Sequence, residues 1–379
     1  MRSEFTTVRL GDLCEIIMGQ SPKSEFYNTD GMGLPFLQGN RTFGDKYPTF
    51  DTYTTSVTKV AEASDVIMSV RAPVGDVNIT PVKLCLGRGV CALRHKNGAQ
   101  EFLYYLMRYY SNELINRESG TVFGSVNRDD IFNLEVSVPP LKEQLVIGHV
   151  LSTIDDKIAI NNAINQHLEQ IAQAIFKSWF VDFEPSKPIT DFVEVLGGGT
   201  PKTGIPEYWN GVIPFFTPKD VSGVYTLTTE KTLTAEGLRN CNSRLFPTNT
   251  VFVTARGTVG KLTLAGCPMA MNQSCYALIG KEGYGQYYVY HLTQYVVENL
   301  KHKASGAVFD AIVTRDFETE LVPNISPDEV RLFEDKVAPL YEAILNYSQE
   351  NARLAALRDT LLPRLMSGEL SVADLEDIT

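Results

Sequence analysis

Two stretches of the chain carry hydrophobic residues at the spacing of a coiled-coil seam. In residues 143–183, which contain no proline, apolar side chains recur at alternating steps of four and three residues. The helical rise would make this run about 60 Å long. The same seam recurs 186 residues later, from Phe333 to Leu365. The pattern therefore predicts two long helices.

Polar residues interrupt both seams at one shared heptad position, which is occupied by Asn165 and by Asn351. A polar Asn in such a seam selects one register by requiring a partner. We expect the two helices to pair with each other as an antiparallel coiled coil, or with helices of another subunit. Two independent amphipathic helices, each packed on its own domain, are the alternative. The residues expected to pair the helices are Ile154, Ile158, Asn165, Leu168, Leu340, Ile344, Asn351 and Leu354.

The second helix contains Pro339 and Pro363, which have no counterpart in the first. Proline within a helix removes a hydrogen bond and clashes with the preceding turn. We therefore expect the second helix to start or kink near Pro339 and to kink or end near Pro363.

The sequence outside the helices also repeats. Three blocks align in the same order, at offsets that drift only from 179 to 187 residues. Arg71 falls on Arg256 in the second block. The aligned blocks are 10–22 with 189–201, 64–80 with 249–265, and 119–131 with 305–317. Several matches at nearly constant offset indicate an internal repeat.

Each copy combines strand and helix patterns. Short apolar runs bounded by Gly, Pro and Asn predict strands, whereas residues 100–115 and 285–300 have apolar residues at helical spacing. The predicted fold is two similar α+β domains separated by two long helices, with pseudo-twofold symmetry. The expected segments are 1–138 and 189–324 for the domains, and 139–188 and 325–379 for the helical spacers.

The formal net charge of −11 counts against nucleic-acid binding, which usually leaves a basic footprint. Most of the excess lies in residues 325–379, with 5 basic and 11 acidic residues, whereas residues 189–324 have 11 and 12. A basic face on each domain is compatible with this distribution. No stretch approaches the roughly 18 apolar residues of a membrane span, so we expect a cytoplasmic protein without a membrane partner.

Motifs of catalysis and metal binding are absent from the sequence. The six cysteines form no CxxC pair and are interpreted as small buried apolar residues. There is no Walker A loop and no Asn-Pro-Pro-aromatic tetrapeptide of an amino-methyltransferase, and no nuclease-like acidic constellation stands out. We expect no catalytic residue, metal or cofactor in this chain.

Two similar but non-identical domains on a stiff spacer suit a target with two different, separated halves. For DNA, the useful side chains are Arg, Lys, Asn, Gln, Ser and Thr on loops. Because Arg71 and Arg256 recur in both copies, they suit a shared task, either phosphate contact or bracing of a turn. Residues that read bases should differ between copies, which points to the loops around 38–59 and 217–244. The candidates are Gln38, Asn40, Arg41, Arg71, Arg88, Thr217, Lys219, Arg256, Thr258, Asn272 and Gln273.

The first helical segment resembles the central region of type I restriction-modification specificity subunits. The matching residues are Pro139-Pro140-Leu141, Glu143-Gln144, Leu151, Ile154-Asp155 and Lys157-Ile158, and residues 357–370 resemble the closing signature of the family. The resemblance covers essentially the whole chain. The chain departs from the pattern where Ser326-Pro327-Asp328-Glu329 replaces Pro-Leu-x-Glu-Gln.

The resemblance implies a non-catalytic subunit that binds a bipartite double-stranded DNA target, with one half-site per recognition domain. It also implies two modification (methyltransferase) subunits as partners, which would bind S-adenosylmethionine, and restriction/translocase subunits in the full enzyme. Two other hypotheses stay open. A coiled-coil assembly scaffold would show no DNA preference, and a self-contained DNA-modifying enzyme would cleave or methylate DNA alone.

Overall fold

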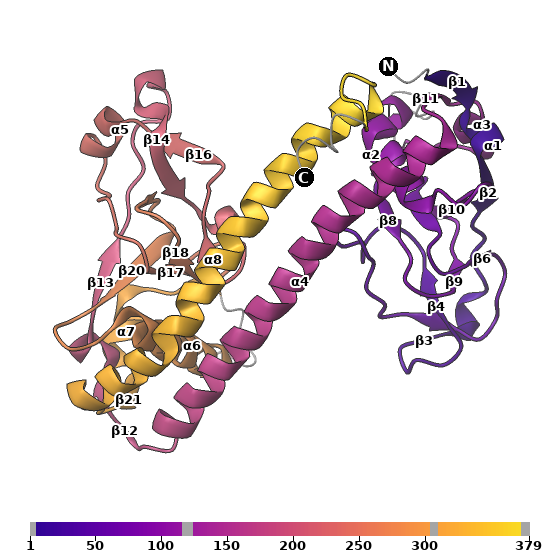
Figure 1. Cartoon of the computed structure of the whole chain (residues 1–379). Helices are drawn as coiled ribbons and strands as arrows, with labels where there is room; N and C mark the ends of the chain where they lie inside the picture. Colours follow the sequence, from indigo (N-terminus) through magenta and orange to yellow (C-terminus); the bar gives the residue numbers. More distant parts are fainter. Residues whose placement is uncertain (1–4, 116–123, 304–309, 373–379) are drawn as a thin grey trace. The chain divides into compact units, whose positions relative to one another are not determined.

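The computed structural model describes residues 5–115, 124–303 and 310–372 (Figure 1). The chain divides into two compact units. The first unit comprises residues 1–158 and 353–379, and the second unit comprises residues 159–352. Two long helices, α4 (Leu141–Phe180) and α8 (Pro327–Met366), contribute residues to both units.

The first unit contains two main sheets and a short strand pair, β1 (Thr6–Arg9) with β11 (Glu135–Val138). One sheet is antiparallel and has the order β2 (Cys14–Met18), β10 (Val90–His95), β7 (Val66–Ser69), β8 (Val77–Ile79). The other has the order β3 (Tyr27–Asn28), β5 (Tyr53–Thr54), β4 (Leu34–Leu37), β9 (Leu84–Leu86), β6 (Val60–Ala61). Its α-helices besides the long ones are α1 (Leu10–Leu13), α2 (Gln100–Ile115) and α3 (Arg128–Phe132).

The second unit repeats this plan, again with a strand pair, β12 (Pro185–Pro188) with β21 (Leu321–Pro323). Its larger sheet has the order β13 (Val193–Gly197), β20 (Cys275–Gly280), β17 (Val251–Thr254), β18 (Leu262–Ala265), β15 (Tyr225–Thr226). Its smaller sheet has the order β16 (Lys231–Leu233), β14 (Trp209–Phe216), β19 (Ala270–Met271). Its shorter α-helices are α5 (Ala235–Arg239), α6 (Gln286–Lys303) and α7 (Thr314–Thr319).

The two units confirm the predicted α+β fold with two similar domains. The order β2-β10-β7-β8 in the first unit corresponds to β13-β20-β17-β18 in the second. The helices at 100–115 and 286–303 match the predicted helical stretches closely. In the third aligned block, residues 119–123 and 305–309 lie outside the described residues.

The long helices confirm the predicted pair, since α4 and α8 each have 40 residues. Of the predicted start or kink of the second helix near Pro339, the start is wrong, because α8 begins at Pro327 and runs through that proline. Ser326 Oγ donates to Glu329 Oε2 at 2.6 Å and the Glu329 N–H donates back to Ser326 Oγ at 3.4 Å. This arrangement caps the helix, and proline suits its first position because the N–H there needs no helical partner. Residues 326–329, where the chain departs from the family pattern, therefore form the start of this helix.

The helix continues through Pro339 because its neighbours are held by the core. Val337 and Tyr341 are fully buried on either side of that proline. Burying each of these two side chains stabilises the fold by about 1.5–3 kcal/mol. This gain offsets the loss of the helical hydrogen bond that proline cannot make. The helix ends at Met366, three residues after Pro363, as predicted.

Within the second unit, α4 and α8 run antiparallel and meet through a polar cluster. Asn161 Nδ2 donates to Asn351 Oδ1 at 2.8 Å, and Asn165 Nδ2 donates to Ser348 Oγ at 3.2 Å. Asn165 and Asn351, which share a heptad position, therefore take different partners. In this unit the two long helices therefore pair with each other, as predicted from the sequence.

Each unit joins its domain to the long helices through a buried polar contact, but the chemistry differs. In the first unit, Asp155 accepts from Tyr105 Oη at 2.6 Å and from Arg358 Nη1 at 2.6 Å. The residues 186 positions away from these three are Tyr341, His291 and Ala172. Tyr341 Oη lies 2.8 Å from His291 Nε2, and Ala172 is fully buried. A charged network in one unit is thus replaced by a neutral one in the other.

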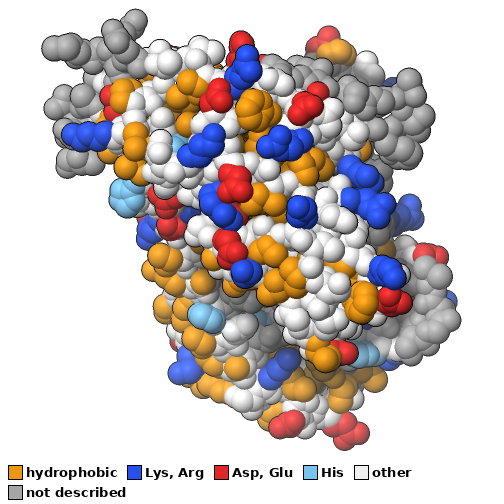
Figure 2. All heavy atoms as spheres, turned by 90° about the vertical axis from the view of Figure 1, so that its right-hand side faces the viewer, with side chains coloured by type: hydrophobic (Ala, Val, Ile, Leu, Met, Phe, Trp, Pro, Cys, Tyr) orange, Lys and Arg blue, Asp and Glu red, His pale blue; other side chains and the backbone are white. Residues whose placement is uncertain are grey.

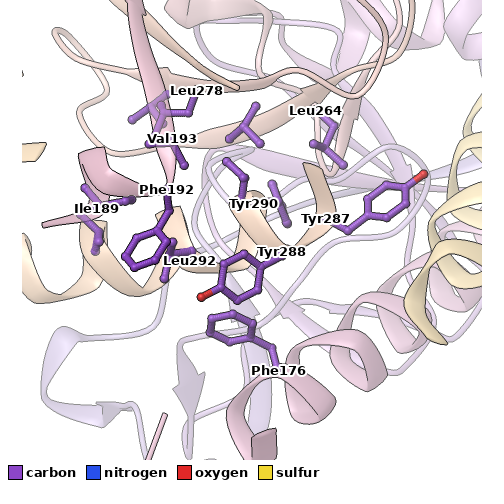
Figure 3. Close-up of a cluster of buried hydrophobic side chains, with 14 of the residues drawn as sticks. Phe176, Ile189, Phe192, Val193, Leu264, Leu278, Tyr287, Tyr288, Tyr290 and Leu292 are labelled. Carbon is purple, nitrogen blue, oxygen red and sulfur yellow. The ribbon is translucent and has the colours of Figure 1, made fainter. Parts of the chain in front are cut away.

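The neutral contact lies within a cluster of aromatic side chains. Phe176 stacks on His291 with ring centroids 5.3 Å apart, and Phe176 and Tyr288 face each other in Figure 3. Phe333 packs edge-on against Phe176 at 5.9 Å. Burial lowers the pKa of His291 to about 4, so this imidazole is neutral at physiological pH.

No helix among the described residues has the length and apolar character of a membrane span.

We expect Glu334 to give the second unit a pH-dependent stability. Its Oε1 accepts the Tyr288 N–H at 2.6 Å, and burial raises the pKa of the carboxyl to about 7. A carboxyl whose pKa is raised on folding contributes its full stability below the ordinary pKa and loses it as pH rises through the folded pKa. Replacing Glu334 with glutamine keeps the acceptor oxygen and removes the titration. We expect E334Q to match wild type near pH 4.5 and to gain about 3 kcal/mol over it above pH 7, which is the free-energy equivalent of the raised pKa.

Urea unfolding of both proteins from pH 4.5 to 8 measures this difference. The titration of His291 occurs in both proteins and cancels in the comparison. Glu282→Gln, at an exposed position of the same unit, is the matched control and should change the free energy of unfolding by less than about 0.5 kcal/mol at any pH. A constant difference between E334Q and wild type across the range would contradict the expectation.

Candidate nucleic-acid interface

Three loops of the first unit meet in one surface cavity. Gln38 follows β4, Arg71 follows β7 and Arg88 precedes β10. These three exposed side chains line the cavity together with Ser21 and Tyr27. The structure thus brings together three of the residues predicted from the sequence.

Ser21 orients the glutamine of this cavity. Ser21 Oγ donates to Gln38 Oε1 at 2.8 Å and accepts the Arg88 N–H at 3.1 Å. Because the oxygen of the Gln38 amide is engaged, its NH₂ group is left as a donor toward the cavity. Gln38 and Arg88 together therefore offer amide and guanidinium donors of the kind that read acceptor atoms on base edges.

The second unit has a corresponding cavity in the corresponding place. It is lined by the predicted residues Thr217, Lys219, Arg256, Thr258 and Asn272. Thr217 follows β14, Arg256 and Thr258 follow β17, and Asn272 precedes β20.

Gln273, the remaining candidate of this unit, is exposed next to that cavity and is bonded by the hydroxyl of Thr200. The repeat places Thr200 on Ser21 and Gln273 on Arg88. Each unit therefore presents one glutamine held by an equivalent hydroxyl, but from a different loop. Ser21 and Thr200 were missing from the sequence candidates, although a hydroxyl shared by both copies before an aligned proline was the signal that identifies them.

Some predicted residues are already engaged with other side chains. Asn40 Nδ2 donates to Asp76 Oδ2 at 2.5 Å, and both terminal nitrogens of Arg41 pair with the Asp51 carboxylate at 2.8 Å. Asn40 and Arg41 line a neighbouring cavity, which also includes Gln38.

Backbone and side-chain contacts also shape the loops of the second unit. Thr217 Oγ1 donates to Asp220 Oδ2 at 2.7 Å, and Thr258 Oγ1 donates to the Pro218 carbonyl at 3.5 Å. Asn272 Oδ1 accepts the Ser274 N–H at 3.0 Å. Asn272 is therefore an acceptor in its own turn, whereas Lys219 is exposed at the cavity rim.

The recurring arginines have fixed backbones and exposed side chains. Arg71 forms an isolated β-bridge with Ser125, and Arg256 forms one with Ala311. Neither guanidinium has an ion pair with another residue of the described ranges. A backbone held in place with an exposed cation favours phosphate contact over bracing of the turn. On the face drawn in Figure 2, Lys and Arg are spread among Asp and Glu rather than gathered in one basic patch.

The predicted helix-pairing residues lie on the seam with different degrees of burial. In the second unit, Ile344 is buried, and Leu168 and Leu340 pack partly buried against the same core. In the first unit, Ile154, Ile158 and Leu354 are half-buried.

The cysteines and the acidic residues offer no alternative centre. Cys14, Cys85, Cys91 and Cys275 are buried, whereas Cys241 and Cys267 are half-buried, so the interpretation of all six as buried is wrong for those two. Both lie in loops of the second unit, Cys241 after α5 and Cys267 after β18. Within the described ranges, no three His, Cys, Asp or Glu side chains gather as metal ligands would.

Comparison with known proteins identifies the family. The family model described as the type I restriction modification DNA specificity domain matches residues 2–170 and 181–323. The putative type I restriction enzyme MjaX specificity subunit of Methanocaldococcus jannaschii is 39% identical over 176 residues, which are 45% of this chain and 41% of that protein. The chain thus spans less than half the length of that relative in this match. The MjaIX specificity subunit of the same organism is 23% identical over 98% of this chain and 95% of that protein.

The solved structure of a type I restriction-modification S subunit from M. genitalium has the same fold. Its TM-score is 0.65 at 15% identity, and the match covers 96% of each chain. The family model covers both repeats and most of the chain. The chain therefore belongs to the type I restriction modification DNA specificity family, which confirms the family predicted from its helical motifs.

Proposed function

We propose that this chain reads a bipartite double-stranded DNA sequence, with one half-site for each recognition domain, residues 1–138 and 189–324. As a specificity subunit, the chain is the non-catalytic component of its enzyme. The observation that carries the proposal is the pair of corresponding cavities, which share an exposed arginine but differ in the residues beside it. A shared arginine suits the phosphate backbone, which is the same in every sequence, and differing neighbours suit two different half-sites.

The residues divide accordingly into two roles. Arg71 and Arg256 contact phosphates. Gln38 and Arg88 read base edges in the first half-site, and Lys219, Asn272 and Gln273 do so in the second, with Thr217 and Thr258 as hydroxyl contacts. Asn40 and Arg41 extend the first surface once released from Asp76 and Asp51.

A specificity subunit acts with modification and restriction subunits on DNA. We propose two modification subunits, one for each unit, in the cytoplasm, with S-adenosylmethionine bound to them rather than to this chain. Exposed apolar residues on α4 support docking at the helices. Leu141 and Leu145 are 39% and 48% exposed in the first unit, and Ile160 and Ile171 are 57% and 49% exposed in the second.

Co-expression with the modification subunit of the same source, followed by sequencing of methylated bases in the host genome, tests the proposal. The expected result is a split motif of two short, different elements with a fixed gap. Replacing residues 1–138 with the corresponding domain of a relative should change only one element. A stable complex without methylation would favour an assembly scaffold instead.

A further inference from the structure

We infer that Lys46 is a positioning residue that ties the first DNA-reading loop to helix α4. This inference rests on the proposed function, because it concerns the loop between β4 and β5, which begins with Gln38. Among the described residues of the second unit, Val224 takes the position of Lys46, so this tether has no counterpart of the same chemistry there.

The side chain of Lys46 is buried and fully engaged with α4. The residue is 8% exposed, and its Nζ lies 2.6 Å from Asp156 Oδ1 and 2.9 Å from Ser152 Oγ. Removing an ammonium group from water costs free energy that only good geometry with an acceptor offsets. The two contacts join residues 106 and 110 positions apart in the sequence, so the pair fixes the loop on the helix.

The backbone around Lys46 is held by two further elements, β8 and α2. The Ile79 N–H of β8 donates to the Lys46 carbonyl at 2.8 Å, and Tyr104 Oη of α2 donates to the Asp45 carbonyl at 3.0 Å. Asn78 exchanges two hydrogen bonds with the backbone of Gly44, at 2.8 and 3.0 Å. The segment 44–46 is thus the anchored part of a loop whose other part, at 38–41, lines the candidate DNA cavities.

The second unit anchors its loop at the same point with apolar residues. The Leu264 N–H donates to the Val224 carbonyl at 2.7 Å, which places Val224 in the position that Lys46 has beside Ile79. The helix position of Ser152 is taken there by Ala338, 186 residues later. Val224 and Ala338 both pack against the main hydrophobic core of the second unit. Valine takes the place of the lysine and alanine that of the serine, whereas the helix position of Asp156 is again acidic, as Glu342. The second unit therefore lacks the cation of this ion pair rather than its acid.

The consequence is that the first half-site is read from a loop whose position depends on an ion pair. A loop released from α4 would misplace Gln38, Asn40 and Arg41 relative to the bases. Because Lys46 is buried, removing its side chain would lower the DNA affinity by displacing these residues. It would not remove a phosphate contact.

The test uses the full complex with modification subunits and DNA duplexes that carry the methylated motif. We expect Lys46→Met to weaken binding about tenfold when the first element is intact, the size of one lost base contact. Affinity for a duplex in which the first element is scrambled should stay at the wild-type value. The slope of log affinity against log salt should also be unchanged, whereas loss of a phosphate contact would reduce it by about 0.9.

Matched variants separate positioning from stability. Lys83→Met removes an exposed ion pair with Glu62 in the same unit and should leave both duplexes bound as by wild type. Lys46→Arg should restore most of the affinity. If Lys46→Met does not fold, Asp156→Asn, whose side chain is 53% exposed, removes the same pair from the other side and should give the same selective loss.

Two outcomes overturn the inference. Equal affinity of wild type, K46M and D156N for the intact duplex would show that the tether does not position the loop. If the wild-type complex itself fails to distinguish the intact from the scrambled duplex, the proposed function fails, and the inference fails with it.

Discussion

Replacing Arg358 with alanine is expected to lower the free energy of unfolding by about 3–5 kcal/mol, the range for breaking a buried ion pair from one side. The side chains of Arg358 and Asp155 are 15% and 7% exposed, and they meet at 2.6 Å. In the variant, Asp155 keeps the Tyr105 hydroxyl, while the nearest other cation, Arg108, lies at 4.0 Å. The carboxylate would then be buried without a close counter-ion. Denaturant unfolding monitored by circular dichroism measures the loss.

Arg364→Ala is the matched control on the same helix. Arg364 pairs with Glu369 at 3.1 Å, but the two side chains are 44% and 64% exposed. An exposed pair contributes about 0–1 kcal/mol, so this variant should unfold close to wild type. Equal effects of R358A and R364A would mean that the Asp155 network is hydrated in solution.

Arg358 illustrates what the sequence could and could not predict. The heptad pattern places it on the seam, where an apolar residue is usual, and the 186-residue offset places Ala172 at its counterpart. The reason for a cation there is its partner, Asp155, 203 positions away. Heptad spacing gives the face of each helix but not the stagger of an antiparallel pair, so the partner cannot be read from the pattern.

The same limit explains the two asparagines. Asn165 and Asn351 are equivalent in the repeat, yet in the second unit Asn351 faces Asn161, and Asn165 faces Ser348. Equivalent positions in a repeat face each other only for one stagger of the two helices. The repeat nevertheless predicted both long helices and the end of the second near Pro363, because periodic burial is a local property, whereas the start suggested near Pro339 was wrong.

The sequence predicted only part of the candidate DNA surface, because a repeat identifies shared residues but not the contacts between distant ones. Arg71 and Arg256 were identified by recurrence, and the structure adds that Gln38 and Arg88 lie beside Arg71. The tether of Lys46 gave no sequence signal, since a single lysine in a loop is usually a solvated charge. Its burial depends on tertiary contacts with α4 that no local pattern encodes.

The contrast between Arg71 and Arg88 gives the largest expected effect on DNA recognition. Arg88→Gln places in the first unit the residue that Gln273 provides in the second. Arginine recognises guanine with two hydrogen bonds and glutamine recognises adenine. We expect R88Q to change the preferred base at one position of the first element, with a discrimination of about 1–3 kcal/mol, and to leave the second element unchanged.

Arg71→Ala is the matched comparison, because Arg71 lines the same cavity and is assigned to phosphate. It should weaken binding to the intact and the scrambled duplex alike, and it should reduce the salt slope by about 1. Binding to duplexes with each base at each position of both elements, measured at several salt concentrations, distinguishes the two variants. If R88Q instead weakened all duplexes uniformly with a reduced slope, Arg88 would be a phosphate contact, and base reading in the first half-site would rest on Gln38 and its loop.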